Sequence, residues 1–189
     1  MKTQLAVLLV VAMMVPSAFA IGDITVGPYF GMAMPLANDD AESGALYGFQ
    51  ARVSLIPGLS IGGHYQSRGY GNPSQTFFEG TPQEFTDEKD GGDVTSIGLD
   101  AYFGKAGGMP GLNFYFMGSY GTYKWKRDNQ DEISKTAFAV GPGVELVLPM
   151  KVGIEGRALI EVAPTGESGS WKSFLWFVGI NYHIGLGPM

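Results

Sequence analysis

Side chains that alternate between apolar and polar types constrain the fold of this chain more than any other feature. Segment 173–184 shows the pattern best. Its even-numbered positions are all apolar or aromatic: Phe174, Trp176, Val178, Ile180, Tyr182 and Ile184. Successive residues of a β-strand point to opposite faces of a sheet, so a period of two predicts a strand with two different faces.

The same alternation recurs in eight segments, most of them 9–13 residues long. A tilted strand needs about 9–11 residues to cross a membrane, so these segments have the length of membrane-spanning strands. Helical periodicity is scarce between them. The predicted strands are 24–34, 47–55, 59–68, 96–103, 112–121, 137–148, 152–161 and 173–184.

The connections between these segments alternate in length. Short turns are expected at 56–58, 105–111 and 149–151, and longer polar loops at 37–44, 69–93, 126–133 and 163–170. Barrels of the bacterial outer membrane have an even number of strands, short turns at one end and longer loops at the other. A soluble barrel has no reason to sort its loops in this way.

The ionisable residues of the predicted strands all lie on the mixed face, and the opposite face carries none. They are Arg52, His64, Arg68, Asp100, Glu145, Glu155, Arg157, Glu161 and His183. A lumen lined by charges is tolerable when the charges pair, whereas an aromatic exterior would aggregate in water. The sequence therefore predicts an all-β fold, a closed eight-stranded antiparallel up-and-down transmembrane β-barrel with the apolar face toward lipid.

The charges of the mixed face are the candidate site. We expect the arginines to pair with the carboxylates and fill the lumen, because eight strands enclose little space. The same network could instead gate an ion path if an arginine exchanged partners. The predicted lumen network, structural or gating, is Arg52, Arg68, Asp100, Glu145, Glu155, Arg157 and Glu161.

Residues 1–20 have the features of a secretory signal peptide. Lys2 precedes an apolar stretch of about 11 residues, and Ala18-Phe19-Ala20 is a small-x-small cleavage site. We expect cleavage after Ala20 and a barrel domain over 21–189. That remainder has no apolar run long enough for a transmembrane helix and no cysteine for a disulfide.

The leader, the eight alternating segments and the closing segment 176–184 together resemble the small outer-membrane β-barrel family of the OmpA/OmpX type. The resemblance covers residues 22–184. It implies a bacterial outer-membrane location, contact with outer-membrane lipid, and insertion by the barrel assembly machinery. Members of this family commonly end on an aromatic residue, whereas this chain continues past Ile184, with Tyr182 as the nearest outward aromatic.

Few residues invite a catalytic interpretation. His64 and His183 both have inward parity, and Ser67 lies on the opposite face from His64, so no Ser-His pair forms. Motifs for zinc proteases, serine hydrolases, phosphate loops and redox dithiols are missing. We therefore expect no enzyme, no cofactor and no metal site, and keep a lipid A-modifying barrel enzyme as an alternative.

Loop 69–93 is strongly acidic and also carries phenylalanines. It predicts either a hydrated surface or a binding site for an extracellular ligand or a cation. The chain has a formal charge of −6 and only four arginines, which argues against binding nucleic acid. The expected function is a structural or surface-interaction role, with a small pore and a soluble periplasmic ligand-carrying barrel as further alternatives.

Overall fold

The computed structural model describes residues 22–36, 42–56, 58–71, 74–77, 85–88, 91–104, 110–126, 132–164 and 169–185. The expected signal peptide, 1–20, lies outside these residues. No helix in the described part of the chain is long and apolar enough to cross a membrane.

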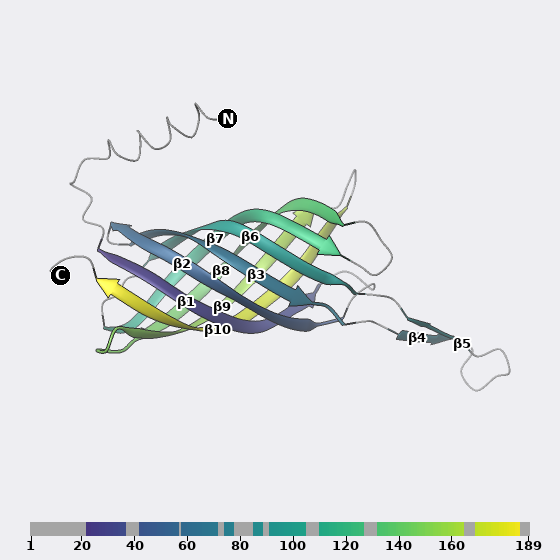
Figure 1. The fold of residues 1–189 in the computed structure, drawn as a ribbon, viewed down its shortest axis with the longest axis horizontal. Helices are drawn as coiled ribbons and strands as arrows, with labels where there is room; N and C mark the ends of the chain where they lie inside the picture. Colours follow the sequence, from purple (N-terminus) through teal and green to yellow (C-terminus); the bar gives the residue numbers. More distant parts are fainter. Residues whose placement is uncertain are drawn as a thin grey trace, which may run out of the picture.

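Eight strands close into one antiparallel barrel (Figure 1), as the alternation predicted. Each strand pairs with its neighbours in the barrel, and β1 pairs with β10 to close the sheet, with Ile24 opposite Ile184. Closure leaves no unpaired sheet edge in the wall, as a strand structure in hydrocarbon requires. The strands are β1 (Asp23–Pro35), β2 (Gly44–Ile56), β3 (Leu59–Gly69), β6 (Asp93–Gly104), β7 (Gly111–Lys126), β8 (Ile133–Val147), β9 (Val152–Pro164) and β10 (Ser170–Gly185).

Several strands run further than the alternation predicted, by several residues at the end of the barrel with the longer connections, here called the long-loop end, and by at most one residue at the other end. β7 continues to Lys126, β8 begins at Ile133 and β10 begins at Ser170. Outward positions such as Thr122 and Lys124 are polar there, so the apolar pattern ends before the backbone pairing does.

The long connection between β3 and β6 contains a hairpin that the sequence did not predict. β4 (Ser74–Phe77) pairs antiparallel with β5 (Phe85–Glu88), forming a separate two-stranded sheet. This hairpin projects beyond the barrel at the long-loop end, opposite the end where β1 starts and β10 finishes (Figure 1).

The side chains on the inner and outer faces of the wall are those that the alternation predicted. Large apolar side chains cover the outside, where Ile97 is 65% and Leu99 is 73% exposed. Charged side chains are inside, where Arg52 and Glu145 are almost completely buried. This is the reverse of a water-soluble barrel and matches a barrel that is surrounded by lipid.

Inward glycines make room for the tyrosines that fill the lumen. A Cβ at Gly143 would lie within 2.4 Å of the Tyr115 ring, and a Cβ at Gly48 would lie 2.5 Å from the Tyr29 ring. Both tyrosines are buried. The glycine content of the strands therefore serves tight filling of a narrow barrel, in which large and small side chains alternate on the inner face.

Candidate functional site

The lumen is organised around Arg52, which reaches across the barrel from β2. Its guanidinium forms ion pairs with Glu145 of β8 and with Glu155 of β9, the latter with Nη1 2.8 Å from Oε1. Glu145 and Glu155 are directly opposite each other in the β8–β9 register. Like charges in that position repel each other, and the positive charge of Arg52 offsets the repulsion between the two carboxylates.

Neutral polar side chains complete the hydrogen bonding of the two glutamates. Asn181 donates from Nδ2 to Glu145 Oε1 at 2.6 Å and to Glu155 Oε2 at 3.1 Å, and Tyr115 donates its hydroxyl to Glu155. Gln50 donates to Asn181 Oδ1 at 2.8 Å. Carboxylates buried in a barrel are tolerated when their lone pairs are satisfied in this way.

Arg157, also on β9, is the second cation of this level. Its Nη2 lies 3.2 Å from Glu155 Oε2, and its guanidinium carbon lies 4.3 Å from the Phe177 ring centroid and 5.4 Å from that of Tyr29. Arg157 also donates to Gln50 Oε1. Aromatic faces attract a desolvated cation, so rings and carboxylate hold it together.

Arg68 and Glu161 form a separate pair nearer the long-loop end. Arg68 Nη2 donates to Glu161 Oε1 at 2.6 Å, and its guanidinium carbon lies 5.1 Å from the Tyr123 ring centroid and 5.8 Å from that of Tyr70. The predicted lumen residues are thus divided into two levels of the barrel rather than one continuous cluster.

Asp100 contacts a histidine instead of an arginine. Its Oδ1 lies 2.9 Å from His64 Nδ1, and Tyr102 donates to its Oδ2 at 3.4 Å. The side chain of Asp100 is fully buried. Gly62 is directly opposite Asp100 on the neighbouring strand β3, so the contact with His64 is diagonal, and parity along one strand does not reveal it.

Another cluster, at the short-turn end, was not predicted as a site. His183 Nδ1 lies 2.8 Å from Asp23 Oδ2, and its Nε2 lies 3.2 Å from Glu145 Oε1. Thr25 Oγ1 is 3.2 Å from the same Nδ1. Asp23 has the parity of Thr25 and directly precedes the predicted strand 24–34, so extending the alternation by one residue would have found it.

The hydroxyl, histidine and carboxylate of this cluster do not form an accessible catalytic site. Thr25 is 0% exposed, and His183 is also buried, so neither can reach an acyl ester on a lipid outside the wall. His64 lies on the inner face as well, whereas Ser67 lines the outer wall. Among the described residues, no group of three or more histidine and carboxylate side chains is placed to hold a metal ion.

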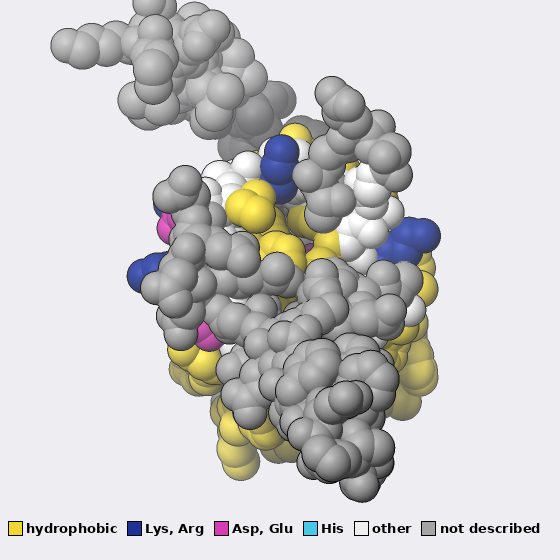
Figure 2. All heavy atoms as spheres, turned by 90° about the vertical axis from the view of Figure 1, so that its right-hand side faces the viewer, with side chains coloured by type: hydrophobic (Ala, Val, Ile, Leu, Met, Phe, Trp, Pro, Cys, Tyr) yellow, Lys and Arg dark blue, Asp and Glu magenta, His cyan; other side chains and the backbone are white. Residues whose placement is uncertain are grey.

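Three rings close the lumen at the long-loop end, and we call Tyr70, Trp125 and Trp171 the aromatic cap. The Trp171 ring centroid lies 4.5 Å from that of Trp125 and 5.5 Å from that of Tyr70. Tyr70 and Trp171 both hydrogen-bond to Ser173 Oγ, at 3.0 and 2.8 Å. Viewed from this end, apolar side chains are visible within the mouth and basic side chains at its rim (Figure 2).

Small cavities remain in the lumen beside His64 and Glu161. Two of them have volumes of about 20 Å³ each, and both are lined by His64, Ser119 and Glu161. A water molecule needs about 10–15 Å³ on this measure, so each cavity has room for about one water. Side chains rather than solvent therefore fill the described part of the lumen.

No protein-family model matches the sequence, and no curated protein is similar enough in sequence to count as a relative. Solved structures do match. Neisserial surface protein A superposes with a TM-score of 0.65 at 14% identity, over 85% of this chain and 98% of that one. The N-terminal β-barrel domain of Pseudomonas aeruginosa OprF gives 0.53 at 18% identity, over 85% and 98%. A major outer membrane protein from Thermus thermophilus gives 0.50 at 11%, over 86% and 99%. The chain therefore has the fold of eight-stranded outer-membrane β-barrels, consistent with the OmpA/OmpX type.

Proposed function

We propose that this chain is a non-catalytic barrel of the bacterial outer membrane that holds an acidic arm, residues 69–93, outside the cell for contact with a cationic extracellular partner. The observation that carries the location is the reversed distribution of side chains. Ile97 and Leu99 stand exposed on the wall, while Arg52 and Glu145 are buried. Such a wall would be a large apolar surface in water and is stable in lipid.

The filled lumen supports a structural role over conduction. Arg52 and Arg157 lie across it at one level, Arg68 at another, and the aromatic cap closes the long-loop end. An ion path would require several of these buried groups to separate together. Uncompensated charges in the barrel interior are costly, so a closed lumen is the stable arrangement.

The two ends of the arm are joined to each other, and one of them is also bonded to the mouth of the barrel. Tyr70 N donates to Gly92 O at 3.0 Å, and Trp125 Nε1 donates to Gly91 O at 3.0 Å. The barrel thus provides a fixed base from which β4 and β5 project (Figure 1). Such a base is useful when a loop must be presented in one orientation, because loops carry binding residues on rigid scaffolds.

The sequence of the arm fits a positively charged partner. Its only basic residue, Lys89, is outnumbered by Glu79, Glu84, Asp87, Glu88, Asp90 and Asp93. Clustered charge of one sign speeds the encounter with the opposite sign and makes it sensitive to salt.

The test uses the barrel reconstituted in phosphatidylcholine vesicles and a fluorescent decalysine peptide as probe. We expect salt-sensitive binding that is lost when the acidic residues of the arm are replaced by their amides. Both proteins must show the same heat-modifiable gel mobility, which verifies a closed barrel. Equal binding by the two proteins would show that the arm is not the contact surface, and a chain that stays out of outer-membrane fractions would overturn the location.

A further inference from the structure

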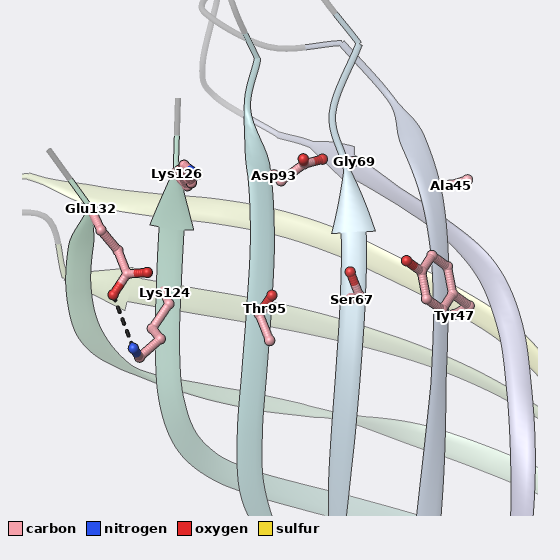
Figure 3. A pocket seen from close by; sticks show the side chains of 9 residues that line it. All are labelled: Ala45, Tyr47, Ser67, Gly69, Asp93, Thr95, Lys124, Lys126 and Glu132. Atoms are coloured by element: carbon pink, nitrogen blue, oxygen red, sulfur yellow. Dashed lines mark hydrogen bonds and ion pairs between the residues drawn. The ribbon is translucent and has the colours of Figure 1, made fainter. Parts of the chain in front are cut away.

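The outer wall has a hollow near the long-loop end (Figure 3), here called the wall hollow, and most of the residues that line it are polar or charged. Its volume is about 600 Å³. It extends over β2, β3, β6 and β7 to the start of β8, on the outside of the barrel. The lining residues are Ala45, Tyr47, Ser67, Gly69, Asp93, Thr95, Lys124, Lys126 and Glu132.

Small side chains on adjacent strands create the wall hollow. Ser67 is opposite Tyr47 on one side and Thr95 on the other, and Thr95 is opposite Lys124. The row therefore runs from a large ring, over two short hydroxyl side chains, to a long lysine. Figure 3 shows the same arrangement, with Ser67 and Thr95 between the flanking side chains of Tyr47 and Lys124.

The charged groups of the wall hollow are available to a ligand. Lys124 Nζ lies 2.9 Å from Glu132 Oε1, but these side chains are 54% and 48% exposed. Exposed ion pairs contribute little free energy, so an anion can take the place of Glu132. Lys126 is opposite Asp93 in the register and supplies a second ammonium group at the same rim.

The position of the wall hollow indicates what kind of molecule fits it. One step along the strands toward the short-turn end, the outward side chains become apolar: Tyr65 is 52% and Ile97 is 65% exposed. A little further along β7, Tyr120 is 62% exposed. Polar groups that border an apolar wall on its long-loop side fit an amphiphilic molecule. Its headgroup would occupy the wall hollow and its acyl chains would lie along the apolar strands.

We propose that the wall hollow binds the phosphorylated headgroup of a lipid in the outer leaflet. Lys124 and Lys126 bind the phosphate, Ser67 and Thr95 donate hydrogen bonds to it, and the carboxylates of Asp93 and Glu132 accept hydrogen bonds from hydroxyl or amino groups of the same headgroup. The proposal rests on the proposed outer-membrane location and does not depend on the proposed partner of the acidic arm, with which the wall hollow shares Gly69 and Asp93.

The experiment is native mass spectrometry of the purified barrel in maltoside micelles, with bisphosphorylated lipid A as the probe. The test variant is Lys124→Ala with Lys126→Ala. The matched control is Lys135→Ala with Lys172→Ala, which removes the same charge from exposed lysines of β8 and β10 that do not line the wall hollow. We expect the test variant to retain about tenfold less lipid and the control to match the parent protein.

A second variant tests whether lipid binding needs the open volume of the wall hollow as well as its lysine charges. Thr95→Trp keeps every lysine and fills the wall hollow, so it should also reduce lipid retention, while heat-modifiable mobility reports that the barrel is folded. Excess inorganic phosphate should not displace the lipid, because the apolar wall holds its chains. Equal losses in the test and control lysine variants, full retention by Thr95→Trp, or displacement by inorganic phosphate would each overturn the proposal.

Discussion

Replacing Arg52 by methionine is the most informative perturbation of the lumen. Arg52 is the residue that ion-pairs with both Glu145 and Glu155, which face each other across β8 and β9. Without it, two buried carboxylates lose a shared cation. Removing one partner of a buried ion pair costs about 3–5 kcal/mol of folding free energy.

The contacts that remain to the two glutamates place the expected loss of folding free energy at the lower end of that range. Glu155 keeps Arg157 at 3.2 Å, and Glu145 keeps His183 and Asn181 at 3.2 and 2.6 Å. We therefore expect Arg52→Met to lower the free energy of unfolding by about 3 kcal/mol. Urea titration of the reconstituted barrel, followed by tryptophan fluorescence and by heat-modifiable mobility, measures this loss.

A triple variant tests the cause. Combining Arg52→Met with Glu145→Gln and Glu155→Gln removes the unpaired charges and should restore more than half of the lost stability, because neutral amides can share hydrogen bonds where carboxylates repel. Lys135→Met, at an exposed position, is the control and should change little. If Arg52→Met is as stable as the parent, or if the triple variant recovers nothing, then charge compensation is not what holds this level of the lumen.

Other perturbations test further parts of the barrel. Gly153→Ala would place a Cβ 2.5 Å from Glu145 Oε1, and overpacking of this kind should cost about 1–3 kcal/mol in the same urea titration. Trp171→Ala removes the middle ring of the aromatic cap and should cost about 3 kcal/mol, whereas Trp176→Ala on the outer wall should cost less. Leu99→Arg puts a charge on the apolar exterior, further from the wall hollow than Ile97, and should lower stability in lipid by about 2–4 kcal/mol, an effect that disappears if this face is not in lipid.

The wall of the barrel was predictable because one physical rule governs it. Each residue between the short turns and the polar rim either faces lipid or faces the lumen, so alternation at positions such as Phe174 and Leu175 records the orientation directly. Toward the long-loop end of β7 the pattern is reversed, because Tyr123 and Trp125 are buried on the inner face while the outward Lys124 and Lys126 are polar. The alternation of the wall therefore did not predict the last residues of β7, nor the β4–β5 hairpin, which forms a sheet separate from the barrel.

The partners inside the lumen were less predictable than its composition. The sequence placed Asp100 and Arg68 on the inner face, as observed, but it did not show that Asp100 meets His64 or that Arg68 meets Glu161. The Arg68 pairing crosses the barrel from β3 to β9, and the Asp100 pairing is a diagonal contact between the neighbouring strands β6 and β3. They depend on strand tilt and stagger, which a single sequence without register information does not contain.

The ion pairs of Arg52 also have a consequence for how the barrel forms and deforms. Hydrogen bonds in the wall tie each strand only to its neighbours, whereas Arg52 ties β2 to β8 and β9, which lie several strands away around the circumference. These ion pairs cross the lumen and connect opposite sides of the barrel. They can form only when the sheet has closed into a barrel, so they favour cooperative closure over the addition of one strand at a time. In the finished barrel they resist flattening by the lateral pressure of the bilayer.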